Sequence, residues 1–352
     1  MQLKTETFTV HKKFALRISR GTTAESTNIW LKITQDNIEG WGEASAFSIT
    51  PDHPKDTASL LAELGQTIPH LERFHPLQRQ EIMALLLKLK VSSSIKAAID
   101  MALHDWLGKK VGLPLWQIWG LNGTLEGISP LSVTIGISTP ERAVARLKHW
   151  QDTLEPKILK LKLGNPEGVE ADQLMIEAIR RAAPQARITV DANGGWNFED
   201  AVYMSKWLEQ QGVEYIEQPL SVSLDHQLEA LSKVSPLPIF VDESCFTSAD
   251  IPRLAKSVAG VNLKIMKTGG LTEAIQTIQV AKACGLQIMF GCYSDSVLAN
   301  TAMAHLSPYA DYVDLDSHLN LKDDPFLGAT IVEGCLVPNC QPGLGVTRQF
   351  NN

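Results

Sequence analysis

The chain has 352 residues, of which 44% are hydrophobic and 20% charged, enough for one large domain and a smaller second one. Its formal net charge of −7 argues against nucleic acid or an anionic membrane surface as a partner. No apolar stretch approaches the roughly 18 residues of a membrane span, and the start of the chain lacks the basic-then-apolar order of a signal peptide. The five cysteines form no Cys-x-x-Cys pair. We therefore expect a cytoplasmic protein with reduced thiols.

Residues 1–123 read as strands followed by helices, which indicates an α+β domain. Alternation of polar and apolar residues predicts strands over 3–10, 14–21, 26–33 and 40–47. Helical spacing follows over 54–68, 77–89 and 93–112. We expect the serines near Ser92 to cap the last helix and Gly112 to end it.

From about residue 124 the pattern changes to short apolar strands separated by helical segments. The strand candidates are residues 131–137, 157–164, 187–194, 213–220, 237–244, 261–270, 286–294 and 312–317. Eight such strands are typical of a parallel β/α barrel, here over residues 124–322, with a doubly wound open sheet as the structural alternative. The tail, residues 323–352, reads as coil and strand, and we expect it to pack back on the first domain.

Charged residues stand near the carboxyl ends of strands that should be almost entirely apolar, because both faces of a parallel barrel strand are covered. They are Lys160, Lys162, Asp191, Glu217, Asp242, Glu243 and Lys264. Burying a charge is costly unless it is paired or binds a metal. Barrel active sites lie at the carboxyl ends of the strands. The pattern therefore predicts a functional site at that mouth.

Three of these acids, Asp191, Glu217 and Asp242, are each about one β/α unit apart. They should project from neighbouring strand ends toward one point, where three carboxylates form a hard oxygen site that suits Mg²⁺. The alternative is that each acid caps the helix that follows it. We expect Asn193 and Glu243 to hold the metal ligands in position.

Lysines flank the acidic strands. Lys160 and Lys162 are two apart and share one face of a strand, and Lys264 lies on the strand after the last acid. Two lysines facing each other across a divalent cation suit removal of the proton beside a carboxylate, with return of a proton from the other side. The alternative for residues 157–164 is an amphipathic surface strand. Lys267 is expected in a loop or at the surface.

Seven short motifs together resemble the enolase superfamily, in the subgroup of muconate lactonising enzymes. They are GWGEA (40–44), KLK (160–162), VDANGGW (190–196), IEQP (216–219), DES (242–244), VNLKIMKTGG (261–270) and PGLG (342–345). The resemblance covers essentially the whole chain. It implies a modified (β/α)₇β barrel with an α+β capping domain built from both chain ends. It also implies one Mg²⁺ per subunit on Asp191, Glu217 and Asp242, with Lys162 and Lys264 as acid/base catalysts.

The last barrel strand carries Asp314 and Asp316, two apart and therefore on one face. An Asp-x-Asp at this point resembles the dipeptide epimerases, where the pair holds the α-ammonium group of the substrate. The alternative is a turn or helix-cap role for either aspartate. The same resemblance places Thr134, Lys160 and Cys292 in the substrate site.

In Ala-Glu epimerases an arginine of the N-terminal lid pairs with the glutamate side chain, but here Ser19 falls at that place and Arg20 is one position away. We therefore expect a broader preference that includes small or apolar dipeptides such as Ala-Ala, with Ala-Glu as a further candidate. His305 and His318 are expected to be ordinary polar residues rather than catalysts.

The predicted activity is a dipeptide epimerase that inverts the C-terminal residue's α-carbon by 1,1-proton transfer through a metal-stabilised enediolate, in peptide or cell-wall peptide metabolism. The partner is a small dipeptide, and a homo-oligomer is a possible assembly. The alternatives on the same scaffold are a muconate cycloisomerase, an o-succinylbenzoate synthase or an N-succinylamino acid racemase. A catalytically inactive barrel that serves as a binding protein is a further alternative.

Overall fold

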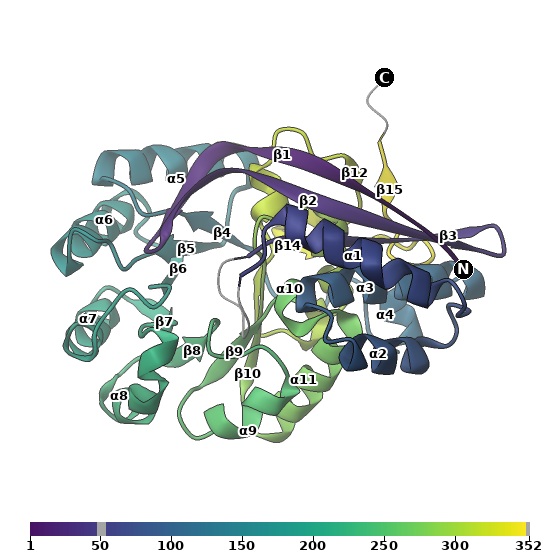
Figure 1. Ribbon diagram of the computed structural model, residues 1–352. Helices are drawn as coiled ribbons and strands as arrows, with labels where there is room; N and C mark the ends of the chain where they lie inside the picture. The colour runs from purple at the N-terminus through teal and green to yellow at the C-terminus, as the bar shows by residue number, and fades with distance from the viewer. Residues whose placement is uncertain (48–53, 350–352) are drawn as a thin grey trace.

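A computed structural model describes residues 1–47 and 54–349 of the chain. The N-terminal part begins with a three-stranded antiparallel sheet made of β1 (Gln2–Ile18), β2 (Gly21–Gln35) and β3 (Ile38–Ala44) (Figure 1). The strands expected over 3–10 and 14–21 are therefore one strand. The register of β1 against β2 is irregular between His11 and Leu16 but resumes beyond it, so the polar interruption does not end the strand.

The helices in the described portion of the N-terminal part are α1 (Thr57–Leu71), α2 (Arg79–Lys88), α3 (Ser93–Val111) and α4 (Leu115–Ile118). Helix α3 lies directly on β3, where a Cβ atom at Gly42 would overlap the carbonyl group of Ala98. This close approach explains the glycine of the GWGEA motif. Helix α3 ends at Gly112 in a left-handed conformation (φ 76°), as expected. Ser92 is its N-cap residue, but its hydroxyl donates to Glu63 Oε2 (2.6 Å) and accepts no hydrogen bond from a backbone N–H of the helix.

Eight parallel strands follow in sequential order and nearly close into a barrel. They are β4 (Ser132–Ile135), β5 (Ile158–Lys162), β6 (Arg187–Asp191), β7 (Val213–Glu217), β8 (Ile239–Val241), β9 (Gly260–Leu263), β10 (Gln287–Gly291) and β11 (Tyr312–Asp314). A parallel bridge between Leu131 and Val313 joins the last strand to the start of the first. Tyr215 of β7, Phe240 of β8 and Met289 of β10 form a buried cluster, so these side chains fill part of the barrel.

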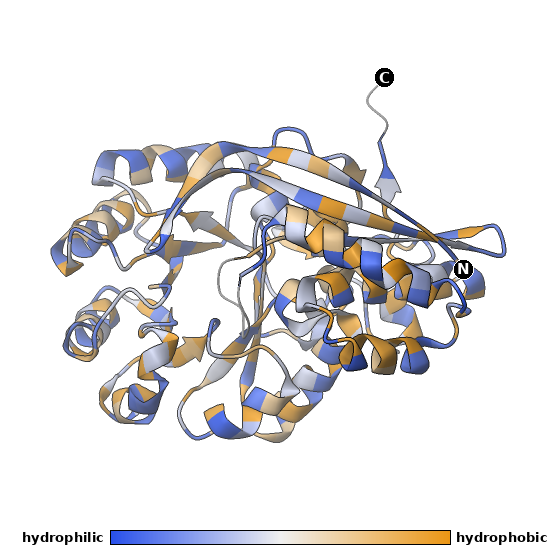
Figure 2. Ribbon diagram, in the orientation of Figure 1, coloured by the Kyte–Doolittle hydropathy of each residue, from blue (hydrophilic) through white to orange (hydrophobic). Residues whose placement is uncertain are grey.

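Helical segments connect the strands and surround the barrel (Figure 1). They are α5 (Pro140–Leu154), α6 (Val169–Ala182), α7 (Phe198–Gln210), η1 (Val222–Gln227), α8 (Leu228–Val234), η2 (Ser248–Asp250), α9 (Ile251–Leu254), α10 (Ile265–Thr268), α11 (Leu271–Ala283), α12 (Val297–Ala304), η3 (Ser307–Tyr309) and η4 (Ser317–Asn320). The outer helices carry both hydrophilic and hydrophobic residues (Figure 2), as expected of helices with one face on a sheet. The predicted (β/α)₇β barrel with an α+β cap is confirmed.

The C-terminal segment contributes four short strands, β12 (Phe326–Leu327), β13 (Thr330–Val332), β14 (Cys335–Val337) and β15 (Thr347–Arg348). The ring of Phe326 lies 5.7 Å from that of Phe8 on β1 and 6.0 Å from that of Trp41 on β3. The segment thus contacts the N-terminal sheet, while the domain boundaries at 123 and 322 stay predictions. Across residues 1–47 and 54–349, no helix has the length and apolar character needed to cross a membrane.

The buried His305 has structural contacts. Trp116 N donates to His305 Nδ1 (3.4 Å), and His305 Nε2 lies 3.0 Å from the carbonyl oxygen of Leu344, to which it can donate in the neutral form. His305 therefore joins α12 to the C-terminal segment. Burial lowers the pKa of His305 to about 4, and that of His318 also to about 4.

We expect His305 to make the protein less stable at low pH. Its pKa of about 4 in the folded state lies below the ordinary value of 6.5, so the unfolded chain binds more protons between these values. The free energy of unfolding should fall as the pH drops through this window, by at most about 1.4 kcal/mol per pH unit. In urea unfolding at pH 4.5 to 7.5, His305→Gln should give a shallower pH dependence than wild type. The exposed His226→Gln is the control, and equal slopes for all three proteins would contradict the prediction.

Candidate functional site

The three predicted metal ligands lie at neighbouring strand ends. Asp191 ends β6, Glu217 ends β7, and Asp242 directly follows β8. Asp191 pairs in register with Lys162 on one side and with Glu217 on the other. All three acids are fully buried. The parallel strands therefore bring these carboxyl groups to one edge of the barrel.

Lysines pair with the two outer acids of this row. Lys162 Nζ lies 2.6 Å from Asp191 Oδ2, and Lys264 Nζ lies 2.6 Å from Asp242 Oδ2. Lys162 ends β5 and Lys264 follows β9, so the three acidic strands lie between the two lysines. The order around the barrel mouth is lysine, aspartate, glutamate, aspartate, lysine. This arrangement places two amines on opposite sides of a buried carboxylate cluster.

The expectation that Lys267 lies in a loop or at the surface is wrong. The residue is 1% exposed, and its Nζ contacts Asp242 Oδ1 (2.6 Å) and the carbonyl oxygen of Asn262 (2.9 Å). The cause is the short helix α10, which begins directly after Lys264 and turns the chain so that Lys267 points back to Asp242. A single helical turn leaves too little periodicity in the sequence to be recognised.

Lys160 connects the acidic row to the last barrel strand. It is 1% exposed, and its Nζ lies 2.6 Å from Asp314 Oδ2 and 2.7 Å from Glu217 Oε2. The contact with Glu217 is an ion pair without hydrogen-bond geometry. The amide of Asn262 donates to the other oxygen, Glu217 Oε1 (2.7 Å). A contact between Lys160 and a substrate stays a prediction.

The charged groups in this cluster shift one another's pKa values. Burial raises the pKa of Glu217 to about 7, and the neighbouring Asp191 carboxylate acts in the same direction. Burial also acts to raise the pKa values of Asp191 and Asp242, but the lysines beside them outweigh it and hold both below the ordinary value. Burial acts to lower the pKa of Lys264, and the attraction of Asp242 outweighs it, so the result is well above the ordinary value. The pair of Lys264 and Asp242 is therefore a charged pair.

Oxygen ligands suited to a hard cation are present. Within the described ranges, no three His, Cys, Asp or Glu side chains are grouped closely enough to hold a metal by themselves, because lysine amines stand between the carboxylates. Glu217 Oε2, Glu243 Oε2 and Asn193 Oδ1 are buried and have no hydrogen-bond partner among the described residues. Buried oxygens without a partner are costly, and Mg²⁺ prefers carboxylate and amide oxygens. The donor set fits Mg²⁺, while the ligand roles stay predictions.

Asn193 contacts a predicted metal ligand directly. Its backbone N–H donates to Asp191 Oδ1 (2.8 Å) and its side-chain amide to Asp191 Oδ2 (3.0 Å). The same amide lies 3.4 Å from Glu243 Oε1. These bonds fix both oxygens of Asp191, as expected of a residue that orients a ligand.

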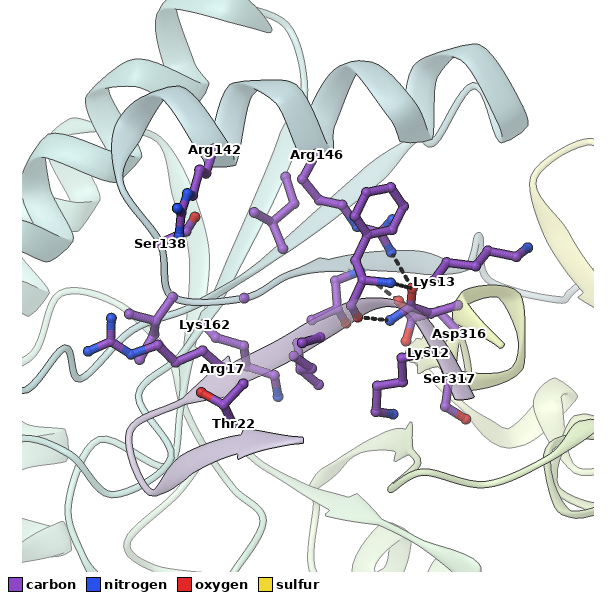
Figure 3. Close-up of a pocket in the computed structure, with 18 of the residues that line it drawn as sticks. Lys12, Lys13, Arg17, Thr22, Ser138, Arg142, Arg146, Lys162, Asp316 and Ser317 are labelled. Atoms are coloured by element: carbon purple, nitrogen blue, oxygen red, sulfur yellow. Dashed lines mark hydrogen bonds between the residues drawn. The ribbon is translucent and has the colours of Figure 1, made fainter. Parts of the chain in front are cut away.

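A cavity of about 730 Å³ opens between β1 and the barrel mouth (Figure 3). Its lining includes the predicted site residues Lys162, Thr134, Cys292, Asp314 and Asp316. Thr134 N donates to Asp316 Oδ2 (2.6 Å), and Cys292 Sγ donates to the carbonyl oxygen of Asp314 (3.3 Å). The structure thus brings four of the five predicted substrate contacts to the cavity that holds Lys162.

Lys264, the second lysine predicted to be catalytic, and the aspartate pair are related to this cavity in different ways. Lys264 Nζ lies 4.3 Å from the ring centre of Tyr293, which lines the cavity. Burial and the neighbouring Asp314 raise the pKa of Asp316 to about 6. Burial also acts to raise the pKa of Asp314, but Lys160 outweighs it and lowers the value. Lys160 therefore compensates the charge of Asp314, whereas the negative charge of Asp316 is less compensated.

Sequence reasoning missed several cations that line the cavity. They are Lys12, Lys13 and Arg17 of β1 and Arg142 and Arg146 of α5. The guanidinium of Arg146 lies 4.1 Å from the ring centres of both Phe14 and Trp150. The paired lysines at 12 and 13 interrupt the alternation of β1 and were a usable signal, whereas the arginines of α5 resemble ordinary residues of an exposed helix face.

Neither residue at the predicted lid position reaches toward the cavity as the Ala-Glu pattern would require. Arg20 forms an ion pair with Glu243 Oε1 (2.7 Å), and the Ser19 hydroxyl donates to the carbonyl oxygen of Asn193 (3.1 Å). Both contacts lie on loops of the barrel mouth.

Family models match both parts of the chain. The N-terminal domain of the mandelate racemase / muconate lactonizing enzyme family matches residues 4–120, and the enolase C-terminal domain-like model matches residues 142–350. The chain is 40% identical to a hydrophobic dipeptide epimerase of Flavobacteria bacterium (strain MS024-2A), over 96% of this chain and 95% of the relative. It is 35% identical to an L-Ala-D/L-Glu epimerase of Bacteroides thetaiotaomicron, over 94% of this chain and 82% of the relative.

A solved structure of the same shape is that of a dipeptide epimerase from Cytophaga hutchinsonii complexed with Mg and the dipeptide D-Ala-L-Val. It superposes with a TM-score of 0.92 at 27% identity and covers 99% of this chain and 96% of the other. The resemblance predicted from the seven motifs is thereby confirmed. The chain belongs to the mandelate racemase / muconate lactonizing enzyme family of the enolase superfamily.

Proposed function

We propose that this protein is a Mg²⁺-dependent dipeptide epimerase that inverts the α-carbon of the C-terminal residue. The observation that carries the proposal is the placement of Lys162 and Lys264 on either side of three buried acids. The aspartate pair at the adjoining cavity and the relatives named as dipeptide epimerases support it. A cytoplasmic role in peptide or cell-wall peptide metabolism is part of the same proposal.

The two lysines perform the proton transfer. Inversion requires one amine to take the α-proton from one face of the carbon while the other amine returns a proton to the opposite face. Lys162 and Lys264 come from opposite ends of the acidic row, and each is fixed by an aspartate at 2.6 Å. The neutral amine acts as base and the other, as ammonium, acts as acid. The reverse reaction exchanges these roles, so each stereoisomer has its own base.

Asp191, Glu217 and Asp242 would hold Mg²⁺ at the end of the site where the substrate carboxylate lies. When bound, the cation supplies positive charge to the carboxylate oxygens of the substrate and offsets the aspartate charge that now keeps the pKa of Lys264 high. Asn193 keeps both oxygens of Asp191 in place through its two hydrogen bonds.

The other end of the site binds the substrate's ammonium group. Asp314 already pairs with Lys160, so Asp316, which lines the cavity and accepts one bond from Thr134 N, has capacity for a cation. With a pKa raised to about 6, Asp316 is mostly ionised at neutral pH. A free α-ammonium group distinguishes a dipeptide from the substrates of the alternative activities, which have none.

We propose small or apolar dipeptides, of the Ala-Ala type, as substrates. Leu16, Ile135 and Ile137 line the cavity, and Ser19 stands where an Ala-Glu enzyme has arginine. The relative named as a hydrophobic dipeptide epimerase supports this preference. Arg17 and Arg142 line the same cavity and favour an acidic dipeptide such as Ala-Glu as the second candidate.

We expect epimerisation to require both lysines. Exchange of the α-proton of a given stereoisomer should require only the lysine that faces it. In D₂O with Mg²⁺, we expect Lys162→Ala and Lys264→Ala to lose epimerase activity by on the order of 10³-fold, as expected for a general acid or base. Each variant should still exchange the α-proton of the one stereoisomer that faces its remaining lysine, measured by mass spectrometry. The exposed Lys233→Ala is the control. Exchange of both stereoisomers in either variant would refute the two-base mechanism.

The ammonium contact gives a prediction that separates dipeptides from the alternative substrates. Asp316→Asn keeps an oxygen that can accept from Thr134 N but removes the charge. We expect kcat/KM for Ala-Ala to fall by about ten- to a hundredfold, the value of a charge-assisted hydrogen bond. Activity toward an N-succinylamino acid, which has no ammonium group, should not fall. An Asp316→Asn enzyme with undiminished dipeptide kinetics would favour the alternatives.

A further inference from the structure

The hairpin of β1 and β2 reaches across the barrel mouth to the ends of β5 and β6 (Figure 1). Ser19 and Arg20 form its two-residue turn, which is closed by the pairing of Ile18 with Gly21. Both turn residues donate to a single acceptor, the carbonyl oxygen of Asn193: the Ser19 hydroxyl at 3.1 Å and Arg20 Nη1 at 2.6 Å. The end of the hairpin therefore rests on the loop that follows Asp191.

Arg20 binds a second loop at the same time. Its Nη2 lies 2.7 Å from Glu243 Oε1, next to Asp242 in the loop after β8. The Glu243 side chain is only 5% exposed, so the ion pair is screened far less by solvent than a surface pair. One planar guanidinium thus joins the loops that carry two of the three proposed metal ligands.

Asn193 transmits this contact to Asp191. Its carbonyl oxygen accepts from the hairpin, while its N–H and side-chain amide donate to the two oxygens of Asp191 (2.8 and 3.0 Å). Asn193 has a φ of 46°, a left-handed conformation that glycine and asparagine adopt most readily. One residue therefore directs its carbonyl oxygen to the hairpin and its amide groups to Asp191, so the two sets of contacts are coupled.

The barrel loops leave room for the turn. A Cβ atom at Gly195 would lie 3.0 Å from Ser19 Cβ, and one at Gly164, two residues after Lys162, would lie 3.3 Å from the same atom. A Cβ atom would also lie 2.5 Å from the carbonyl oxygen of Ala192 at Gly164 and 2.9 Å from it at Gly195, so these glycines allow both the packing of the barrel loops and the approach of the turn. The turn also borders a second cavity of about 790 Å³, which is lined by Arg20, Asn193 and Glu243.

We propose that Arg20 is a positioning residue for the metal site: it holds the Asn193 carbonyl and the Glu243 carboxylate together and thereby keeps Asp191 directed at the cation. This inference rests on the proposed Mg²⁺ site. It assigns to Arg20 a role other than contact with the substrate side chain. It also means that the contacts of the β1–β2 turn with the barrel loops help to position a metal ligand.

The charge of Arg20 provides a sharp test. Arg20 is a cation close to the proposed Mg²⁺ site, so by Coulomb repulsion alone its removal should strengthen Mg²⁺ binding. If Arg20 positions the ligands, its removal should weaken binding instead. The two explanations therefore predict opposite signs for the same measurement.

The experiment is a calorimetric titration of wild type, Arg20→Met, Arg20→Lys and Arg187→Met with Mg²⁺. Arg187 forms a bidentate ion pair with Glu214 at the opposite end of β6 and β7 and is the matched control. We expect Arg20→Met to weaken Mg²⁺ binding by about tenfold or more, as for other residues that hold metal ligands. Arg20→Lys should also weaken Mg²⁺ binding, because one ammonium group cannot reproduce the planar guanidinium's simultaneous contacts with Asn193 and Glu243. Arg187→Met should bind as wild type does.

Hydrogen exchange of the metal-free proteins gives a second measurement that does not depend on activity. The amides of residues 191–195 should exchange faster in Arg20→Met than in wild type or Arg187→Met, with thermal melting confirming that all are folded. Unchanged or tighter Mg²⁺ binding by Arg20→Met, or unchanged exchange, would overturn the role of Arg20 alone. Failure of wild type to bind Mg²⁺ would overturn the proposed function and this inference with it.

Discussion

The pairing of buried lysines with buried carboxylates is the constraint on which the barrel mouth depends. Asp191 and Asp242 each accept from lysine at 2.6 Å, and Lys160 lies between Glu217 and Asp314. Removing one partner of such a pair leaves an uncompensated charge in a dry site, which costs far more than the pair contributes. The residues proposed for catalysis are therefore also the ones that keep this end of the barrel electrostatically balanced.

A buried carboxyl group also joins the cap to the barrel. Glu43, the acid of the GWGEA motif, is fully buried and accepts from Asn28 Nδ2 (2.7 Å) and from Ser296 N (3.1 Å) at the start of α12. Burial raises its pKa to about 8. A carboxyl group of the N-terminal sheet thus caps a barrel helix. The glycines of the same motif allow α3 to pack on β3. The motif therefore joins the two parts of the molecule, and β1 can form one wall of the cavity.

The sequence was most informative where a residue's environment is set by a regular element. Charges at the ends of apolar strands predicted the acidic row, because a parallel barrel places all these ends at one edge. It was least informative where a contact depends on distant segments. Lys267 required knowledge of a single helical turn. The contact of Arg20 with Glu243 joins residues more than two hundred positions apart, and no local pattern encodes such a pair.

Lys160 gives this site a fixed length. Its single Nζ contacts Glu217, a proposed metal ligand, and Asp314, the partner of Asp316 in the aspartate pair. Under the proposed function, one buried amine thus connects the metal-binding acids at the substrate's carboxylate end to the aspartate pair at its ammonium end. Because Lys160 is held between strands β4 and β6, the separation of the two ends is set by the barrel rather than by flexible loops.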